Sequence, residues 1–160
     1  MPPLVQESPG FRACKAIGWA GLLAGLLDIS TAFVEAALEG KSPIYLLQAI
    51  AGGWLGEDSF HDGLASAALG LFFHFLIAFT AAAAFYMAAT KLAFLKKHPL
   101  AAGVFYGIAI YAFMSYVVMP LSAYHVSIVL PRIATFTKDV AVHIVMVGVP
   151  IALMVRKYSA

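Results

Sequence analysis

Four long apolar stretches constrain the fold of this chain more than any other feature of its sequence. They cover about residues 16–38, 63–89, 100–119 and 137–155. Each stretch is close to the roughly 20 apolar residues that a helix needs to cross the hydrocarbon core of a bilayer. Hydrophobic residues make up 62% of the chain and charged residues only 11%, so too little charge remains to coat a water-soluble surface. The sequence therefore predicts an all-α polytopic membrane protein, a bundle of four transmembrane helices that forms a single integral membrane domain over residues 1–160.

The first apolar stretch also fits a second interpretation. Arg12 and Lys15 precede its apolar core, and the small residues Ser30–Ala32 could serve as a cleavage site, which is the pattern of a secretory signal peptide. The apolar pattern continues beyond that site to Leu38, however. We therefore favour a membrane span over a signal peptide.

A short apolar run between the first two stretches is too brief to span a membrane. It follows Ser42, and serine before Pro43 is a favourable helix start because proline suits the first helical position. Trp54 comes just after the run, and tryptophan is enriched at the level of the lipid headgroups. We expect a short interfacial helix over residues 43–51.

Prolines and polar residues mark the limits of the last two stretches. We expect the third span to end at Pro120. We expect the fourth to begin with Thr137 as its N-cap, because Asp139 then lies in the first turn, where the helix dipole favours negative charge. Pro150 lies inside the fourth span and should kink it.

The basic residues are distributed unevenly between the two sides of the predicted membrane. The termini and the loop on one side contain Arg12, Lys15, Lys91, Lys96, Lys97, Arg156 and Lys157, and the other side contains Lys41, Arg132 and Lys138. Positive charge is retained in the cytoplasm. We therefore predict a multi-pass protein of a bacterial inner (plasma) membrane with its N- and C-termini in the cytoplasm.

The sequence contains none of the short motifs of the common enzyme classes. It has no HExxH, Walker loop or GxSxG elbow, and its single cysteine, Cys14, cannot form an intrachain disulfide. The small net charge of +2 and the absence of a basic run exclude nucleic acid as a sensible partner. We predict a protein that is not an enzyme, whose partners are membrane lipids and either a second copy of the chain or a larger membrane complex.

Small residues form narrow stripes at helical spacing on three of the predicted spans. Glycine lets two helices approach closely in a membrane, so these stripes predict packing seams. Their glycines are Gly18, Gly21 and Gly25 in the first span, Gly70 in the second, and Gly103 and Gly107 in the third.

Five ionisable side chains fall in the outer half of the predicted bundle: Asp28, Glu35, His74, Asp139 and His143. An ionisable group inside a span is costly and is a functional candidate by default. Asp28 and His74 lie on small-residue stripes at similar depth, so a contact between them would offset part of this cost. The alternative is a structural role for each, as a hydrogen-bonding partner of a neighbouring helix. His143, one turn after Asp139, could face either the bundle or the outer interface.

These five residues allow three hypotheses for a site. A line of titratable groups would form a proton or cation pathway, and converging histidine and carboxylate ligands would form a metal site. A haem b site would use His74 and His143 as its two ligands, although their estimated depths differ by roughly 8 Å at 1.5 Å per residue. We predict no cofactor, with haem b or a metal ion as the alternative.

Several short phrases resemble those of a group of bacterial inner-membrane proteins that carry a domain of unknown function. They are LLQAIAGGWLG (46–56), LGLFFHFLIA (69–78), HPLAAGVFYG (98–107), VMPLSAY (118–124) and HIVMVGVPIAL (143–153). A more distant likeness is to the YagU-like family. The resemblance implies the four-helix architecture and points to His74 and His143. It implies no particular activity.

The function that the sequence favours is a small inner-membrane protein with a polar pocket in the outer half of the bundle. Such a protein would act as an accessory subunit or bind an ion or a small molecule. A haem b- or metal-binding membrane subunit that uses His74 and His143 is the alternative.

Overall fold

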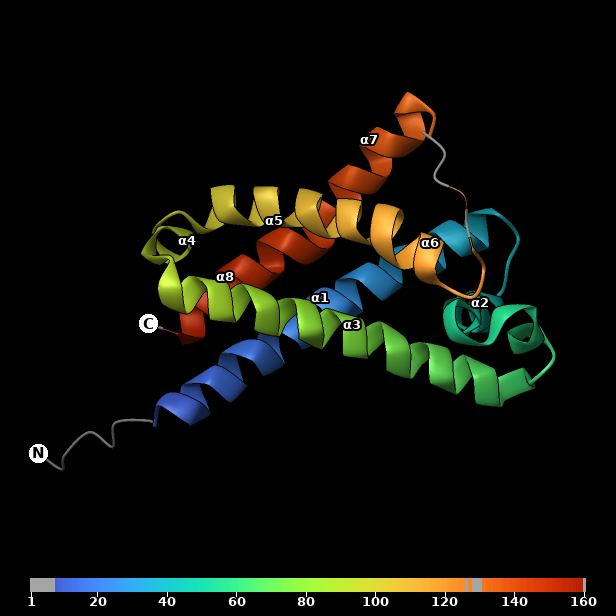
Figure 1. Ribbon diagram of the computed structural model, residues 1–160, viewed down its shortest axis with the longest axis horizontal. Helices are drawn as coiled ribbons and strands as arrows, with labels where there is room; N and C mark the ends of the chain where they lie inside the picture. Colours follow the sequence, from blue (N-terminus) through green and yellow to red (C-terminus); the bar gives the residue numbers. More distant parts are fainter. Residues whose placement is uncertain (1–7, 126, 128–130, 160) are drawn as a thin grey trace, which may run out of the picture.

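The structure is a computed structural model that describes residues 8–125, 127 and 131–159. Four of its helical segments are long and apolar enough to cross a membrane (Figure 1). They cover Pro9–Leu38, Gly63–Lys91, Pro99–Leu121 and Ile133–Tyr158. The described residues form helices, turns and loops without a β-strand. The predicted all-α bundle of four transmembrane helices is therefore confirmed.

The first span, α1 (Pro9–Leu38), begins earlier than the sequence analysis expects. Ser8 caps it, because the Ser8 hydroxyl accepts a hydrogen bond from Phe11 N at 3.2 Å and Pro9 occupies the first turn. Serine before proline is the same start signal that marks the next helix. The span therefore extends back from residue 16 to Pro9.

The interfacial helix α2 (Pro43–Leu55) is also longer than the predicted 43–51. Ser42 caps it by accepting from Tyr45 N at 3.1 Å. Gly52 and Gly53 continue the helix, which stops at Gly56, where φ is +68°, a conformation that favours glycine. A short 3₁₀ turn, η1 (Gly56–Phe60), then leads into α3 (Gly63–Lys91).

The third span is α5 (Pro99–Phe113), η2 (Met114–Val118) and α6 (Met119–Leu121), and the short helix α4 (Ala93–Lys97) connects it to α3. The span continues past Pro120 to Leu121, so the predicted end at Pro120 is wrong by one residue. A π-helical turn, η2, directly precedes α6. A wider π turn accommodates a proline that cannot donate a backbone hydrogen bond.

The fourth span also contains a π-helical segment just before a proline. It consists of α7 (Ile133–Val142), the π-helical η3 (His143–Gly148) and α8 (Val149–Tyr158), and Pro150 lies just after the π segment. Thr137 is not its N-cap. The helix already begins at Ile133, and the Thr137 hydroxyl instead donates to Ile133 O at 3.0 Å, inside the helix.

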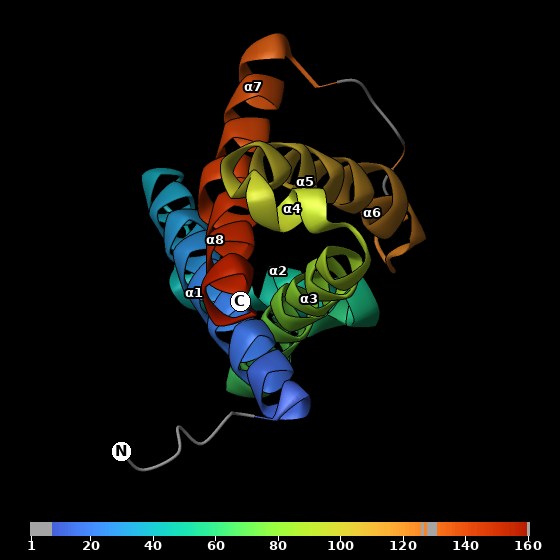
Figure 2. The ribbon, with the colours of Figure 1, turned by 90° about the vertical axis from the view of Figure 1, so that its left-hand side faces the viewer.

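The spans pack around α8. Helix α1 packs against both α3 and α8, and α5 packs against η3 and α8. Seen along the bundle, α8 lies between α1 and α5 (Figure 2). We call the end that contains α4, the start of α1 and the end of α8 the α4 end, and we call the opposite end, where α2 packs against α3, the α2 end (Figure 1).

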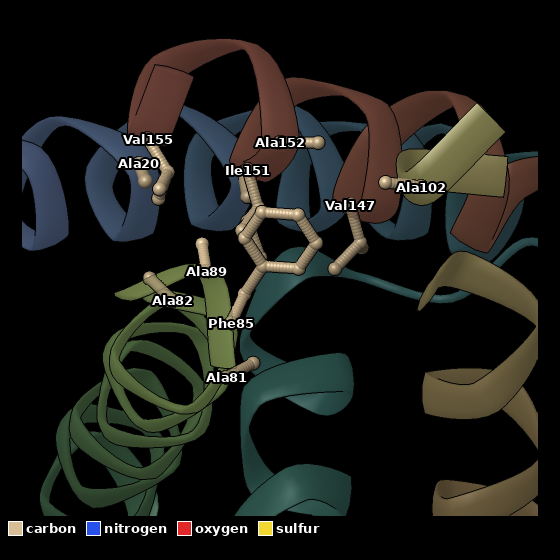
Figure 3. Packing of buried hydrophobic residues seen from close by; sticks show 11 residues of the cluster. Ala20, Ala81, Ala82, Phe85, Ala89, Ala102, Val147, Ile151, Ala152 and Val155 are labelled. Atoms are coloured by element: carbon tan, nitrogen blue, oxygen red, sulfur yellow. The ribbon is translucent and has the colours of Figure 1, made fainter. Parts of the chain in front are cut away.

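The buried core is built largely from alanine. Phe85 reaches from α3 toward Ile151 and Val147, with alanines from the surrounding helices around it (Figure 3). Phe85 is 2% exposed and Ile151 is fully buried. Small side chains let the backbones approach closely, as is usual where helices associate in lipid.

Glycines make the closest helix contacts, and they form two kinds of seam. A Cβ at Gly21 would overlap the side chain of Phe79, so the α1–α3 seam places glycine against an aromatic ring. A Cβ at Gly107 would lie 2.5 Å from Ile144 Cα, so the α5–η3 seam brings backbone against backbone. Gly18 departs from the predicted stripe. No described heavy atom would lie within 4 Å of a Cβ there, and Gly18 is therefore not part of the α1–α3 seam.

Candidate functional site

His74 connects two spans through a hydrogen bond. Its Nε2 lies 2.9 Å from Gly25 O, so α3 donates to the backbone of α1. The carbonyl can only accept, and the proton of a neutral His74 ring is therefore on Nε2. Gly25 permits this approach, since a Cβ there would overlap the ring of Phe75. The geometry matches the structural role that the sequence analysis leaves open for His74.

Asp28 lies half-buried in α1. Within the described part of the chain, no ion pair joins its carboxylate to His74, and none of the hydrogen bonds involves it. Shared depth on neighbouring helices therefore does not bring these two side chains into contact. The register of the α1–α3 seam instead gives His74 a backbone carbonyl as its partner.

The other three predicted residues gather where α7 meets the end of α1. Lys138 Nζ lies 3.1 Å from Glu35 Oε2 and 3.4 Å from Asp139 Oδ1. His143 Nδ1 donates to Asp139 O at 2.8 Å, and its ring meets Tyr111 edge to face with centroids 5.6 Å apart. Lys138 forms ion pairs with both carboxylates, and it was not part of the predicted set.

These five residues therefore do not form one polar pocket. In the described ranges, no three histidine, cysteine or carboxylate side chains lie close enough together to hold a metal ion. His74 and His143 each bond a backbone carbonyl. The proton pathway, the metal site and the haem site stay predictions.

The largest hollow that we describe is apolar and lies elsewhere. It is a groove of about 590 Å³ between α3 and the η2 half of the third span, with α2 at its base. Its walls include Phe73, Leu76 and Ile77 from α3 and Phe113 and Val117 from the third span. Small-molecule sites typically have about 300–1,000 Å³ and mostly apolar walls. We call this hollow the α3–η2 groove.

The base of the groove is held by the turn after α6. Tyr124 Oη donates to Ala49 O at 3.0 Å, and Ala123 N donates to Gly53 O at 2.9 Å. Burial raises the pKa of Tyr124, so its hydroxyl stays protonated and able to donate. A Cβ at Gly52 would overlap this hydroxyl. Gly52 and Gly53 of α2 therefore leave the room that the turn after α6 needs to pack against this helix.

The groove opens at the surface of the bundle. Leu76 is 49% exposed and Phe113 is 54% exposed, although both lie inside membrane-spanning helices. Trp54 contributes to the rim, and its ring centroid lies 6.3 Å from that of Phe73. Ser122 and Tyr124 are the polar side chains of the lining. The hollow therefore combines apolar walls with a few polar groups at one end.

The groove was not predicted from the sequence, because the prediction followed small and ionisable residues within the spans and not the large apolar ones. Large side chains recur at Phe73, Leu76 and Ile77, beside the stripe that contains Gly70. This spacing shows a second apolar face on α3. It does not show whether a neighbouring helix or a hollow covers that face.

Comparisons of the chain with protein-family models, with curated proteins and with solved structures each find no match. The likeness to the YagU-like family stays a prediction.

Proposed function

We propose that this chain is a small multi-pass membrane protein that binds a membrane amphiphile, with one acyl or isoprenoid chain of the ligand in the α3–η2 groove. The observation that supports this is the groove itself, about 590 Å³ with apolar walls inside the membrane-spanning segments. An apolar hollow in this position will be filled by whatever apolar chain reaches it from the side. Binding of this kind suits an accessory subunit or a lipid carrier more than a catalyst.

The polar end of the groove fits the other half of such a ligand. Ser122 and Tyr124 lie where the third span ends, beside the interfacial helix α2. A hydroxyl or ester group at this level would meet these side chains while the chain below it meets Phe73 and Val117. A few polar groups that orient an apolar ligand are the usual composition of a ligand site.

A photoactivatable phospholipid with its reactive group in the acyl chain tests the proposal. The purified protein is reconstituted with this lipid, irradiated, and mapped by peptide mass spectrometry. We expect crosslinks to concentrate on Phe73, Leu76 and Val117, ahead of Phe105 and Leu71, which are exposed outside the groove. Equal labelling of all five positions would show only the ordinary lipid shell and would contradict the proposal.

A matched pair of substitutions sharpens this test. Ala49→Phe adds a ring to the base of the groove, and Ala68→Phe makes the same change at an exposed position of α3 that does not line it. We expect Ala49→Phe to remove most groove crosslinks and Ala68→Phe to leave them unchanged. Circular dichroism of both variants checks that the bundle is intact.

We also propose that the N- and C-termini are cytoplasmic and that the membrane is a bacterial inner membrane. The uneven distribution of lysine and arginine supports this orientation. Cys14 is exposed near the start of α1 and is the single thiol of the chain. A membrane-impermeant maleimide should label Cys14 only after cells are permeabilised. Labelling of Cys14 in intact cells would contradict the proposed orientation.

A further inference from the structure

A second hollow lies at the α4 end of the bundle, opposite the end that contains the α3–η2 groove. It has a volume of about 460 Å³ and lies between the α4–α5 junction and the last turns of α8. Lys97 and His98 border it from the junction, and Arg156 borders it from α8. Two basic side chains from different helices thus border one cavity. We call it the basic cavity.

No carboxylate of the described chain neutralises these charges. The acidic residues of residues 8–159 lie in the middle or last part of α1, around η1, or in α7; they are Asp28, Glu35, Glu39, Glu57, Asp58, Asp62 and Asp139. Neither Lys97 nor Arg156 forms an ion pair with a described residue. Both basic side chains are exposed and are therefore available to an anion from outside this part of the chain.

The remaining walls of the basic cavity are apolar. Leu100 and Leu153 are part of the lining and belong to membrane-spanning helices, and they are 61% and 38% exposed. The start of α5 also borders the cavity, and the positive end of its dipole adds to the attraction that the two basic side chains exert on an anion. Positive charge beside exposed leucine is complementary to a ligand that has an anionic headgroup joined to an acyl chain.

We propose that the basic cavity binds the phosphate of an anionic phospholipid, with Lys97 and Arg156 as its ligands and Leu100 and Leu153 against the start of the acyl chains. Arginine holds a phosphate through two parallel hydrogen bonds, and lysine acts as a point charge. Basic pockets between membrane helices commonly take lipid headgroups in this way. The cavity lies at the opposite end from the α3–η2 groove, so this site does not depend on the proposed function.

Native mass spectrometry of protein extracted from phosphatidylglycerol-containing nanodiscs tests the site. The double variant Lys97→Gln/Arg156→Gln removes both charges from the cavity. The control Lys91→Gln/Lys157→Gln removes the same charge from the same end at exposed positions outside the lining. We expect the cavity variant to bind phosphatidylglycerol about thirtyfold more weakly, and the control to bind it nearly as well as the parent protein. Equal losses in the two variants would show a diffuse charge effect and would overturn the proposal.

Two further experiments distinguish a lipid phosphate from free phosphate and test whether charge or side-chain shape is required for binding. Glycerol phosphate or inorganic phosphate at the same concentration as the lipid should not displace it, because neither contacts the leucines. Displacement by inorganic phosphate would overturn the assignment to a lipid. The reversed pair Lys97→Arg/Arg156→Lys keeps both charges and should retain most binding. Loss of binding in this charge-preserving variant, with unchanged circular dichroism, would contradict the proposed electrostatic role.

Discussion

Helices α3 and α5 are bridged by side chains toward the α4 end of the bundle and are separated by a hollow toward the α2 end. At the α4 end, Tyr106 Oη donates to Ala81 O at 2.7 Å, and the Tyr106 ring meets Phe85 with centroids 5.0 Å apart. Toward the α2 end, Leu76 and Val117 face each other across the α3–η2 groove. The same pair of helices therefore has a closed half and an open half.

The difference shows what closes a helix pair inside a membrane. Lipid is as apolar as a leucine side chain, so burying large apolar residues gains little free energy there. The closed half contains the contact between the rings of Phe85 and Tyr106 and one hydrogen bond between spans. The open half contains phenylalanine and leucine on both walls, and these side chains contact lipid as readily as each other. A hydrogen bond and an aromatic contact therefore close one part of the pair, whereas apolar side chains alone leave the other part open.

The largest expected effect comes from the seam that holds α5 against the fourth span. Gly107→Ala places a Cβ against the backbone of Ile144, and neither helix can yield without shifting. We expect the free energy of unfolding to fall by about 3 kcal/mol, measured by denaturant titration in detergent with circular dichroism. Gly18→Ala is the control, because a Cβ there meets open space. It should change stability by less than about 1 kcal/mol.

Removing one large side chain from each half tests the comparison directly. Phe85→Ala leaves a cavity in the closed half, and we expect a loss of about 2 kcal/mol, below the usual cost in soluble proteins because lipid is also apolar. Leu76→Ala only widens the open half and should cost less than about 0.5 kcal/mol. The same denaturant titration applies to both. Equal losses would mean that the two halves are equally well packed.

A smaller effect than that of Phe85→Ala is expected for the hydrogen bond of the closed half. Tyr106→Phe keeps the ring against Phe85 and removes only the donor to Ala81 O. We expect a loss of about 0.6 kcal/mol, the typical worth of a hydrogen bond between membrane helices. Thermal unfolding in the same detergent, compared with Phe85→Ala, measures it. A loss as large as that of Phe85→Ala would show that the polar contact, not the packing, closes the pair.

The spans were predictable because twenty apolar residues in a row leave one physical solution. The residues at which the spans begin and end were less predictable. The pair Ser8–Pro9 is the same start signal as Ser42–Pro43, yet only the second was recognised, because the first precedes basic residues that suggest a membrane surface. Thr137 looks like a cap in sequence, but its hydroxyl bonds back to Ile133 O within a helix that has already begun.

The candidate site was less predictable than the spans. Ionisable residues such as Asp28 and His74 are conspicuous in an apolar sequence, but whether they meet depends on the register of two helices, and here a backbone carbonyl takes the place of Asp28. The groove depends on where α3 and η2 diverge. That divergence follows from contacts between spans, and the periodicity of one helix cannot show it.

The packing of the turn after α6 against α2 has a consequence for the order in which parts of the fold can form during synthesis. Helix α2 can pack on α3 soon after both leave the ribosome, because Leu47 and Gly70 contact each other and are close in sequence. Tyr124, which reaches the glycines of α2, is synthesised only after the third span. Until that span has inserted, the glycine face of α2 remains uncovered at the membrane surface. The base of the groove is thus a late product of biogenesis, and an apolar chain can be enclosed there only once three of the four spans are in place.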